Sequence, residues 1–137
     1  MKALLVNGSP HKAGCTNAAL KEVGRELQAE GIQTDTFWIG NQPLTGCIGC
    51  GYCAKHGACQ YRDRVNEFLD IAKDYDGFVF GAPVHFASAA ASMLGFLNRA
   101  FFTDQQAELG RFALKPAAAI VSARRAGTTA ALEELNK

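Results

Sequence analysis

Apolar and polar positions alternate along this chain in blocks that indicate four strands, each followed by a helix or a loop. Unbroken apolar or β-branched runs predict strands at 2–7, 33–39, 78–82 and 116–122. Apolar residues at helical spacing predict helices from Thr16 or Asn17 to Gly31, from Asp63 to Ala72, over 88–102, and from about Thr128. Such alternation with short turns predicts an α/β fold, in which a doubly wound parallel sheet carries helices on both faces.

The strand count is one short of a complete sheet of this class. A doubly wound sheet with strand order 2-1-3-4-5 has five strands, and this sequence ends inside the helix that follows the fourth. We therefore expect a single domain over residues 1–137 whose C-terminal part is missing, rather than a four-stranded sheet whose edge a partner covers. With 137 residues, 48% of them hydrophobic, the chain has room for one core.

Charge and cysteine content narrow the class of function. The formal net charge is +1, without runs of like charge, which argues against nucleic acid or an anionic membrane as a partner. The first apolar run ends at Val6, too early for a signal peptide or a membrane span. We expect a cytoplasmic protein that acts on small molecules. In a reducing compartment, five cysteines favour metal binding, catalysis or buried thiols over disulfides.

The most specific motif is C-x2-C-x2-C-x5-C, inside a cysteine-rich loop over 40–62 that follows the second strand. Its members are Cys47, Cys50, Cys53 and Cys59. Glycines between the first three allow sharp folding of the backbone around one centre, so the motif points to electron transfer. Reduced thiols that merely pack are the alternative, and zinc is less favoured because structural zinc sites usually pair two separated C-x2-C halves. Cys15, in the loop after the first strand, has no partner cysteine and suits a position that takes a small residue.

Three loops leave the carboxyl ends of neighbouring strands, where open parallel sheets bind ligands: 8–17, 82–88 and 123–129. The first runs into a helix start and carries Ser9, Thr16 and Asn17, which suits a phosphate held by neutral donors. An ordinary turn with a good helix cap is the alternative. Neither G-x-x-x-x-G-K-[ST] nor G-x-G-x-x-G occurs there, so a phosphomonoester is favoured over ATP or a dinucleotide.

The other two loops carry aromatic and basic residues. His85 and Phe86 could border a flat heterocycle, and His85 is otherwise a surface histidine without a companion carboxylate. Arg124 and Arg125 could attract the phosphate of a nicotinamide cofactor, or form a solvated basic turn. We expect Trp38 to pack at the sheet edge rather than to stack on a cofactor.

Three ordered motifs resemble a known family over nearly the whole chain: GSPHKAGCTN (8–17), CIGCGYCAKHGACQ (47–60) and DGFVFGAPVHFASAAASMLGFLNR (76–99). They are similar to the flavodoxin-like NADPH-dependent FMN reductases, and within them to the iron-sulfur flavoprotein branch. The resemblance implies FMN as cofactor and NAD(P)H as electron donor. The FMN-site residues that it implies are Ser9, His11, Thr16 and Asn17 at the phosphate, Pro83, Val84, His85 and Phe86 at the ring, and Ala123, Gly127 and Thr128 beside it. For the branch, it implies a [4Fe-4S] cluster held by Cys47, Cys50, Cys53 and Cys59.

The chain departs from that family at four places. Tyrosine is common in the family where this chain has His85, and a second acid where it has Arg64. The helix containing Leu94-Gly95-Phe96 lacks the usual lysine. The family's C-terminal strand is absent from the sequence. These departures alter the expected charge and contacts around the flavin ring.

The leading hypothesis is an FMN-dependent oxidoreductase that takes hydride from NAD(P)H and passes electrons to a flavin, a quinone, another small acceptor or a redox protein. An iron-sulfur cluster at the four cysteines would take part in that transfer. One alternative is a non-enzymatic electron carrier, although carriers of this shape usually have an acidic surface. Another is a cysteine-based redox or metal sensor. No nucleophile, histidine and acid set is present, which agrees with chemistry carried by the flavin. The resemblance also implies a homodimer or homotetramer.

Overall fold

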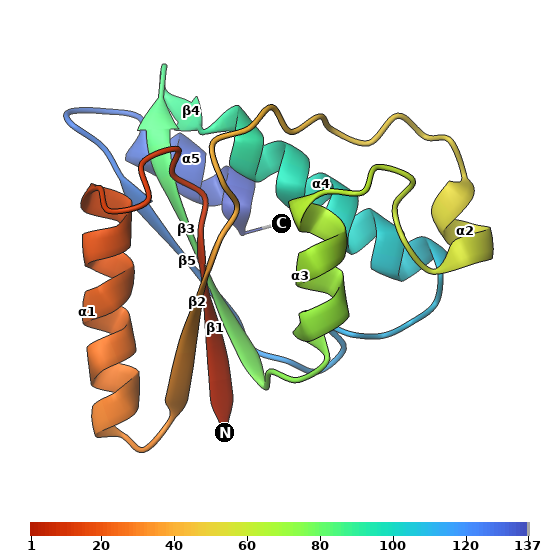
Figure 1. Cartoon of the computed structure of the whole chain (residues 1–137). Coiled ribbons are helices and arrows are strands. Elements are labelled where there is room, and N and C mark those ends of the chain that lie inside the picture. The colour runs from red at the N-terminus through yellow and green to blue at the C-terminus, as the bar shows by residue number, and fades with distance from the viewer. Residues whose placement is uncertain (137) are drawn as a thin grey trace.

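The computed structural model describes residues 1–136, and its centre is a parallel sheet with strand order β2-β1-β3-β5 (Figure 1). The strands are β1 (Lys2–Asn7), β2 (Gln33–Trp38), β3 (Gly77–His85) and β5 (Ala117–Ser122). All three pairings in this order are parallel. A two-residue strand, β4 (Ser88–Ala89), folds back antiparallel on the end of β3. The predicted doubly wound, flavodoxin-like topology is therefore confirmed.

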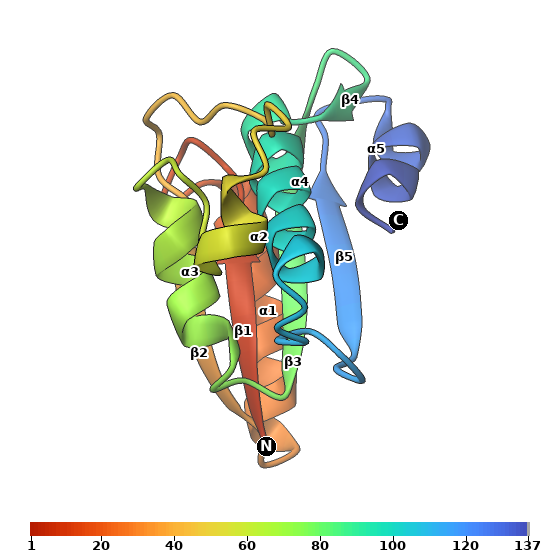
Figure 2. The same cartoon turned by 90° about the vertical axis from the view of Figure 1, so that its right-hand side faces the viewer.

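Helices cover both faces of the sheet. They are α1 (Cys15–Ala29), α2 (Tyr52–His56), α3 (Arg64–Ala72), α4 (Ala91–Gln106) and α5 (Thr128–Leu135). Helix α1 lies on one face, where Leu20 packs against Leu5 and Val79. Helices α3 and α4 lie on the other face, and α5 packs beside β5 near the carboxyl ends of the strands (Figure 2). Within residues 1–136, no helix combines the length and apolar character that crossing a membrane requires.

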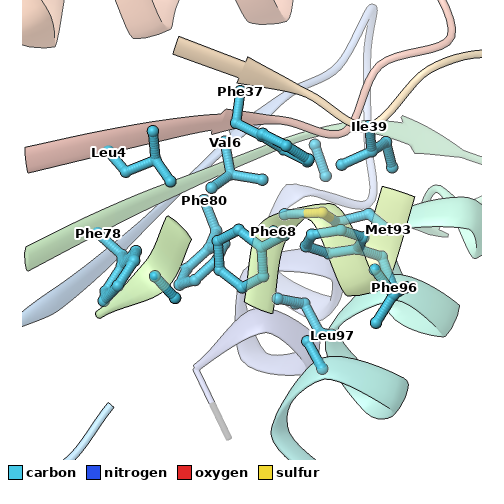
Figure 3. Close-up of a cluster of buried hydrophobic side chains, with 14 of the residues drawn as sticks. Leu4, Val6, Phe37, Ile39, Phe68, Phe78, Phe80, Met93, Phe96 and Leu97 are labelled. Carbon is cyan, nitrogen blue, oxygen red and sulfur yellow. The ribbon is translucent and has the colours of Figure 1, made fainter. Parts of the chain in front are cut away.

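The larger core lies between the sheet and helices α3 and α4, and Phe68 is at its centre (Figure 3). Phe68 is fully buried, and its ring centroid lies 5.0 Å from that of Phe96 and 5.7 Å from that of Phe112. Aromatic pairs at such spacings add to the stabilisation that burial of their area provides. Because Phe96 belongs to α4 and Phe68 to α3, this contact fixes the two helices against each other.

Local signals predicted one helix cap correctly and another wrongly. Asp63 accepts a hydrogen bond from Val65 N at 3.0 Å, so its expected capping of α3 is confirmed. The prediction that Thr16 or Asn17 caps α1 is wrong, because Gly14 occupies that position without a side-chain cap. Thr16 lies buried inside the first turn. Its hydroxyl contacts Ser122 instead.

The remaining differences concern short elements. Helix α2 was not predicted, since five residues between two left-handed glycines, Gly51 and Gly57, give no helical periodicity. Helix α4 begins after the predicted 88, because residues 88 and 89 pair with β3. Within the described residues, β5 pairs with β3 alone, and Ala117 and Ala118 are exposed. That a C-terminal strand is missing stays a prediction.

Candidate functional site

The three loops expected to bind a ligand meet at the carboxyl edge of the sheet. Gly8 N donates a 2.8 Å hydrogen bond to Gly81 O, which joins the first loop to β3. The hydroxyls of Thr16 and Ser122 lie 2.8 Å apart and join α1 to the end of β5. The residues predicted for one site therefore do lie in neighbouring loops, although their roles stay predictions.

The loop after β1 is held in shape from below by Asn7, which is fully buried. Asn7 Oδ1 accepts from Ser9 N at 3.0 Å, and Asn7 Nδ2 donates to Lys12 O at 3.3 Å. Ser9 Oγ accepts from His11 N at 3.1 Å. The loop leads into the start of α1, which has neither a side-chain cap nor an acidic residue in its first turn. Free N–H groups and the helix dipole make such an end favourable for an anion.

Trp38 belongs to this loop's support, which sequence reasoning missed. Its Nε1 donates a 2.7 Å hydrogen bond to Ser9 O, and Lys12 Nζ lies 5.7 Å from the centre of its ring. Packing at the sheet edge was expected, but the side chain instead ties the end of β2 to the loop after β1. No local pattern reveals this contact, because the partners are 29 residues apart.

The loop after β3 forms a tight hairpin with β4. Phe86 and Ala87 at its tip have positive φ angles of 49° and 63°, and the Phe86 side chain is completely exposed. His85 is exposed as well, whereas Pro83 and Val84 are half-buried. The exposed ring on this turn is accessible for contact with a planar ligand.

The base of that hairpin is anchored to α5. The Glu134 carboxylate accepts hydrogen bonds from Ser88 Oγ at 2.9 Å and from Ala89 N at 2.8 Å. The turn before α5 also packs against the hairpin tip, since a Cβ on Gly127 would lie 2.6 Å from Ala87 Cα. Gly127 precedes α5, which begins at Thr128. The loop after β5 is thereby fixed beside the predicted ring-binding segment.

Several predicted residues in the third loop are simply solvent-exposed. They are Ala123, Arg124, Arg125 and Thr128. Neither arginine has a hydrogen bond or ion pair among the described contacts, and the binding of a nicotinamide phosphate by this turn stays a prediction.

Two of the departures from the family pattern, at Arg64 and at Gly95, have structural explanations. Arg64 Nη2 donates to Trp38 O at 2.6 Å, its guanidinium lies 4.1 Å from the Phe37 ring centre, and it pairs with Glu67. The Arg64 guanidinium therefore contacts Glu67 of α3 and the end of β2. Gly95 lets the cysteine-rich loop approach α4, because its Cβ position lies only 3.4 Å from Gly46 N. A long side chain there would displace this loop.

The four motif cysteines line one small pocket against α4. Arg99, Phe102 and Thr103 of that helix form its inner wall, together with Tyr61. Cys53 is buried, Cys59 half-buried, and Cys47 and Cys50 are exposed. Within residues 1–136, no three His, Cys, Asp or Glu side chains are placed to hold a metal ion. The thiols share a pocket without converging on one point.

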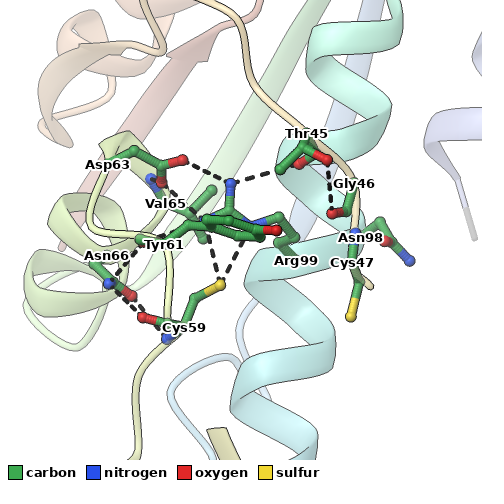
Figure 4. Close-up of polar contacts among 10 residues, drawn as sticks. All are labelled: Thr45, Gly46, Cys47, Cys59, Tyr61, Asp63, Val65, Asn66, Asn98 and Arg99. Atoms are coloured by element: carbon green, nitrogen blue, oxygen red, sulfur yellow. Dashed lines mark hydrogen bonds and ion pairs between the residues drawn. The ribbon is translucent and has the colours of Figure 1, made fainter. Parts of the chain in front are cut away.

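Hydrogen bonds from two helices pin both ends of the cysteine segment (Figure 4). Asn98 Oδ1 on α4 accepts from Cys47 N at 2.9 Å. Asn66 on α3 accepts from Cys59 N at 2.9 Å and donates to Cys59 O at 2.8 Å. Because both asparagines bond to backbone groups, they hold the segment without occupying the thiols.

Arg99 is the buried charge of this region, with 1% of its side chain exposed. Its Nη1 lies 2.7 Å from Asp63 Oδ2, and its Nε and Nη2 lie 3.3 Å and 3.2 Å from Cys59 Sγ. Burial lowers the pKa of Arg99, but hydrogen bonds to Asp63 and Cys59 outweigh burial and raise this pKa above its ordinary value. Arg99 therefore stays charged beside a motif sulfur.

Helix α4 connects the cysteine pocket with the first of the three loops. Near its start, Met93 contacts the first loop, since a Cβ on Gly8 would lie 2.7 Å from Met93 Sδ. Arg99 follows six residues later, which is about 9 Å along a helix. The cysteine pocket thus lies further along α4 than the ligand edge does. The spacing of the motifs in the sequence does not predict this separation.

The family model for NADPH-dependent FMN reductase matches residues 1–137. The chain belongs to this family. An iron-sulfur flavoprotein of Methanocaldococcus jannaschii is 33% identical over 99 residues, which are 72% of this chain and 51% of that protein. An iron-sulfur flavoprotein of Methanosarcina thermophila is 30% identical over 118 residues, 84% of this chain and 58% of that protein. The resemblance to that branch is supported, and this chain spans about half the length of the curated relatives it matches.

Solved structures share the fold of this FMN reductase family member. RosB, determined with 8-demethyl-8-formylriboflavin-5'-phosphate bound, aligns with a TM-score of 0.73 at 16% identity, over 99% of this chain and 59% of that one. FerB from Paracoccus denitrificans, a flavoenzyme NAD(P)H:(acceptor) oxidoreductase, aligns with a TM-score of 0.66 at 19% identity, over 98% and 68%. At these identities the likeness concerns the fold.

Proposed function

We propose that this chain is the FMN-binding domain of an NAD(P)H-dependent oxidoreductase that passes electrons to a flavin, a quinone or another small acceptor. The observation that carries the proposal is the convergence of three loops at the carboxyl edge, around the uncapped start of α1. Family membership supports FMN as the ligand of this edge.

In this proposal, the phosphate of FMN lies at the start of α1. Backbone N–H groups of the first helical turn, Ser9 Oγ and the Asn17 amide donate to it, and His11 lies at the rim. Thr16 fixes the start of α1 rather than donating to the phosphate, because its hydroxyl is already bonded to that of Ser122. Asn7 and Trp38 keep the loop in the shape that presents these donors. A neutral donor set of this kind fits a phosphomonoester.

The flavin ring lies along the hairpin that follows β3 in this proposal. Pro83, Val84, His85 and Phe86 border it, and Ala123, Gly127 and Thr128 close the opposite side. Bound FMN supplies the capacity to accept a hydride and release electrons. The protein holds the ring with one face open to nicotinamide. His85 is exposed and free to take or give a proton, although no side-chain acid or base is obligatory.

We further propose that Cys47, Cys50, Cys53 and Cys59 hold a [4Fe-4S] cluster. Four free thiols lining one pocket match the donor set that such a cluster requires. Zinc is less favoured, because structural zinc sites usually pair two separated C-x2-C halves.

We also propose that the protein works in the cytoplasm as a homodimer or homotetramer. Phe101 and Phe102 are partly exposed, and with Leu94 they form the apolar part of a groove between α4 and α5. Apolar surface of this kind supports a subunit contact. Light scattering coupled to gel filtration measures the molar mass of the protein in solution. A monomer at micromolar concentration would contradict the proposed oligomeric state.

Parallel titrations of the full-length protein with FMN and with riboflavin, followed by flavin fluorescence, test the proposal. We expect saturable binding, with FMN tighter than riboflavin by at least about tenfold, because only FMN carries the phosphate. Asn17→Ala should reduce the ratio of the affinities for FMN and riboflavin. Asn136→Ala, at the end of α5, should leave this ratio unchanged. Folded protein that binds no FMN would overturn the proposal.

Steady-state oxidation of NAD(P)H with a quinone acceptor then tests the activity. Turnover by the FMN-loaded protein supports the oxidoreductase. Bound FMN without oxidation of NADH or NADPH, with any acceptor, would instead favour a non-enzymatic electron carrier.

A further inference from the structure

The cysteine pocket contains a buried cation that flavin chemistry does not use. We propose that Arg99, held by Asp63, donates hydrogen bonds to Cys59 Sγ and thereby raises the reduction potential of an iron-sulfur cluster bound at the four cysteines. Arg99 is in this sense a positioning and tuning residue. The inference rests on the cluster that the proposed function includes.

The guanidinium presents two different edges to two different partners (Figure 4). On one edge, Nε and Nη2 lie 3.3 Å and 3.2 Å from Cys59 Sγ. On the other, Nη1 and Nη2 lie 2.7 Å and 3.0 Å from the two carboxylate oxygens of Asp63. A planar guanidinium bound twice to a carboxylate has a fixed orientation. Asp63 therefore aims the remaining edge of Arg99 at the sulfur.

The surrounding structure leaves little freedom for another arrangement. The Arg99 side chain is 1% exposed, and Nη2 also donates to Tyr61 O at 3.3 Å. The Arg99 guanidinium lies 5.0 Å from the Tyr61 ring centre. Asn66 fixes the backbone of Cys59 from α3. The sulfur and its donors are thus held by two helices, which is what a defined hydrogen bond at a metal ligand requires.

The effect on the potential follows from charge. Reduction adds negative charge to a cluster and its sulfur ligands, so hydrogen bonds to sulfur and a nearby positive charge stabilise the reduced form. Arg99 supplies both, in surroundings where burial strengthens electrostatic interactions. The Asp63 carboxylate opposes Arg99, and it is more exposed, at 32% of its side chain. The two residues should therefore act on the potential with opposite sign.

Redox titration of the reconstituted full-length protein tests this, with the reduced cluster followed by electron paramagnetic resonance. We expect Arg99→Met to shift the midpoint potential downward, because both the hydrogen bonds and the positive charge are lost. We expect Asp63→Asn to shift it upward, since the amide oxygen still accepts from Arg99 and keeps its orientation, while the negative charge that opposes Arg99 is removed. Asparagine is a good helix cap, so α3 should keep its start. If the two substitutions only loosened the cysteine-rich loop, the midpoint potentials of both variants would shift in the same direction.

Arg111 offers a matched control in the same region. It pairs with Asp104 at 3.3 Å and donates to Gly57 O, but among the described contacts it has none with a cysteine sulfur. Arg111→Gln removes a positive charge near the loop without removing a sulfur hydrogen bond. We expect its shift to be much smaller than that of Arg99→Met. An equal shift would contradict the specific role of Arg99.

Each remaining outcome is decisive. Shifts of the same sign, or no shift in either variant, overturn the inference. If Arg99→Met does not fold, the midpoint potential of Asp63→Asn tests the inference by itself. A midpoint potential that is unchanged or lowered in that variant overturns the inference. Wild-type protein that binds FMN but takes up no iron and sulfide overturns this inference and leaves the flavin function standing. Wild-type protein that takes up the cluster but no FMN contradicts the flavin function, and the potentials still test Arg99.

Discussion

Gly127 and Ala87 are in direct backbone contact, because a Cβ on Gly127 would lie 2.6 Å from Ala87 Cα. This contact joins the turn before α5 to the tip of the hairpin after β3. The two segments lie 40 residues apart in the sequence. The proposed ring-binding surface exists as one surface because no side chain separates them.

Gly127→Ala should therefore weaken FMN binding by at least about tenfold, since the hairpin tip must shift to admit the methyl group. Gly127 also has a φ of 92°, a conformation that costs a residue with a Cβ about 1–2 kcal/mol. Gly31→Ala separates the two effects, because Gly31 has a φ of 78° but nothing within 4 Å of its Cβ position. It should lose stability without losing FMN affinity. Equal affinity losses in both variants would rule out the contact as the cause.

Trp38→Phe should weaken FMN binding about 2- to 10-fold, because the 2.7 Å hydrogen bond to Ser9 O is lost while an aromatic ring remains. The dissociation rate, followed by flavin fluorescence, should rise accordingly. Tyr75→Phe is the matched control, since it removes a 2.8 Å hydrogen bond to Asp35 at the other end of the sheet. That variant should bind FMN like the wild type. An unchanged dissociation rate in Trp38→Phe would show that the loop holds its shape without this donor.

Phe68 and Phe86 should respond to alanine substitution in opposite ways. Phe68→Ala empties the centre of the larger core and should lower the free energy of unfolding by about 3–5 kcal/mol. Phe86→Ala should leave it within about 0.5 kcal/mol, because that ring is completely exposed. Only Phe86→Ala should retain the fold and lose flavin affinity. Urea denaturation and FMN titration measure the two quantities, and a destabilised Phe86→Ala would contradict the assignment.

Asp35 should make stability depend on acid pH. Hydrogen bonds from Lys2 and then from Tyr75 hold the pKa of Asp35 below its ordinary value. Its stabilising contribution is then fully present above the unfolded pKa of about 3.9 and is lost as the pH falls through the lower folded value. Because the Asp35 side chain is 50% exposed, we expect at most about 1 kcal/mol. Urea midpoints of wild type and Asp35→Asn should differ at pH 7 and converge near pH 2. A constant difference would contradict this account.

Several features could be predicted because their causes are local in the sequence. Apolar runs identified the strands of the main sheet, and alternation with helices implied their parallel order. Asp63 was recognised as a cap because its acceptor lies two residues from the donor it binds. The clustering of the cysteine motif follows from its spacing, and the ligand edge follows from the topology.

The tertiary structure decided the contacts between residues that are distant in the chain. Thr16 was misjudged as a cap because its partner, Ser122, lies 106 positions away. Trp38 reaches Ser9, and Arg99 reaches both Asp63 and Cys59, only after the sheet has brought their segments together. Periodicity and composition describe which face of an element is buried, but a hydrogen bond depends on the relative placement of two elements to within a few tenths of an ångström. The amino-acid pattern alone therefore determined the architecture and the candidate edge, and packing decided which side chains shape the loops and which sulfur receives a charged donor.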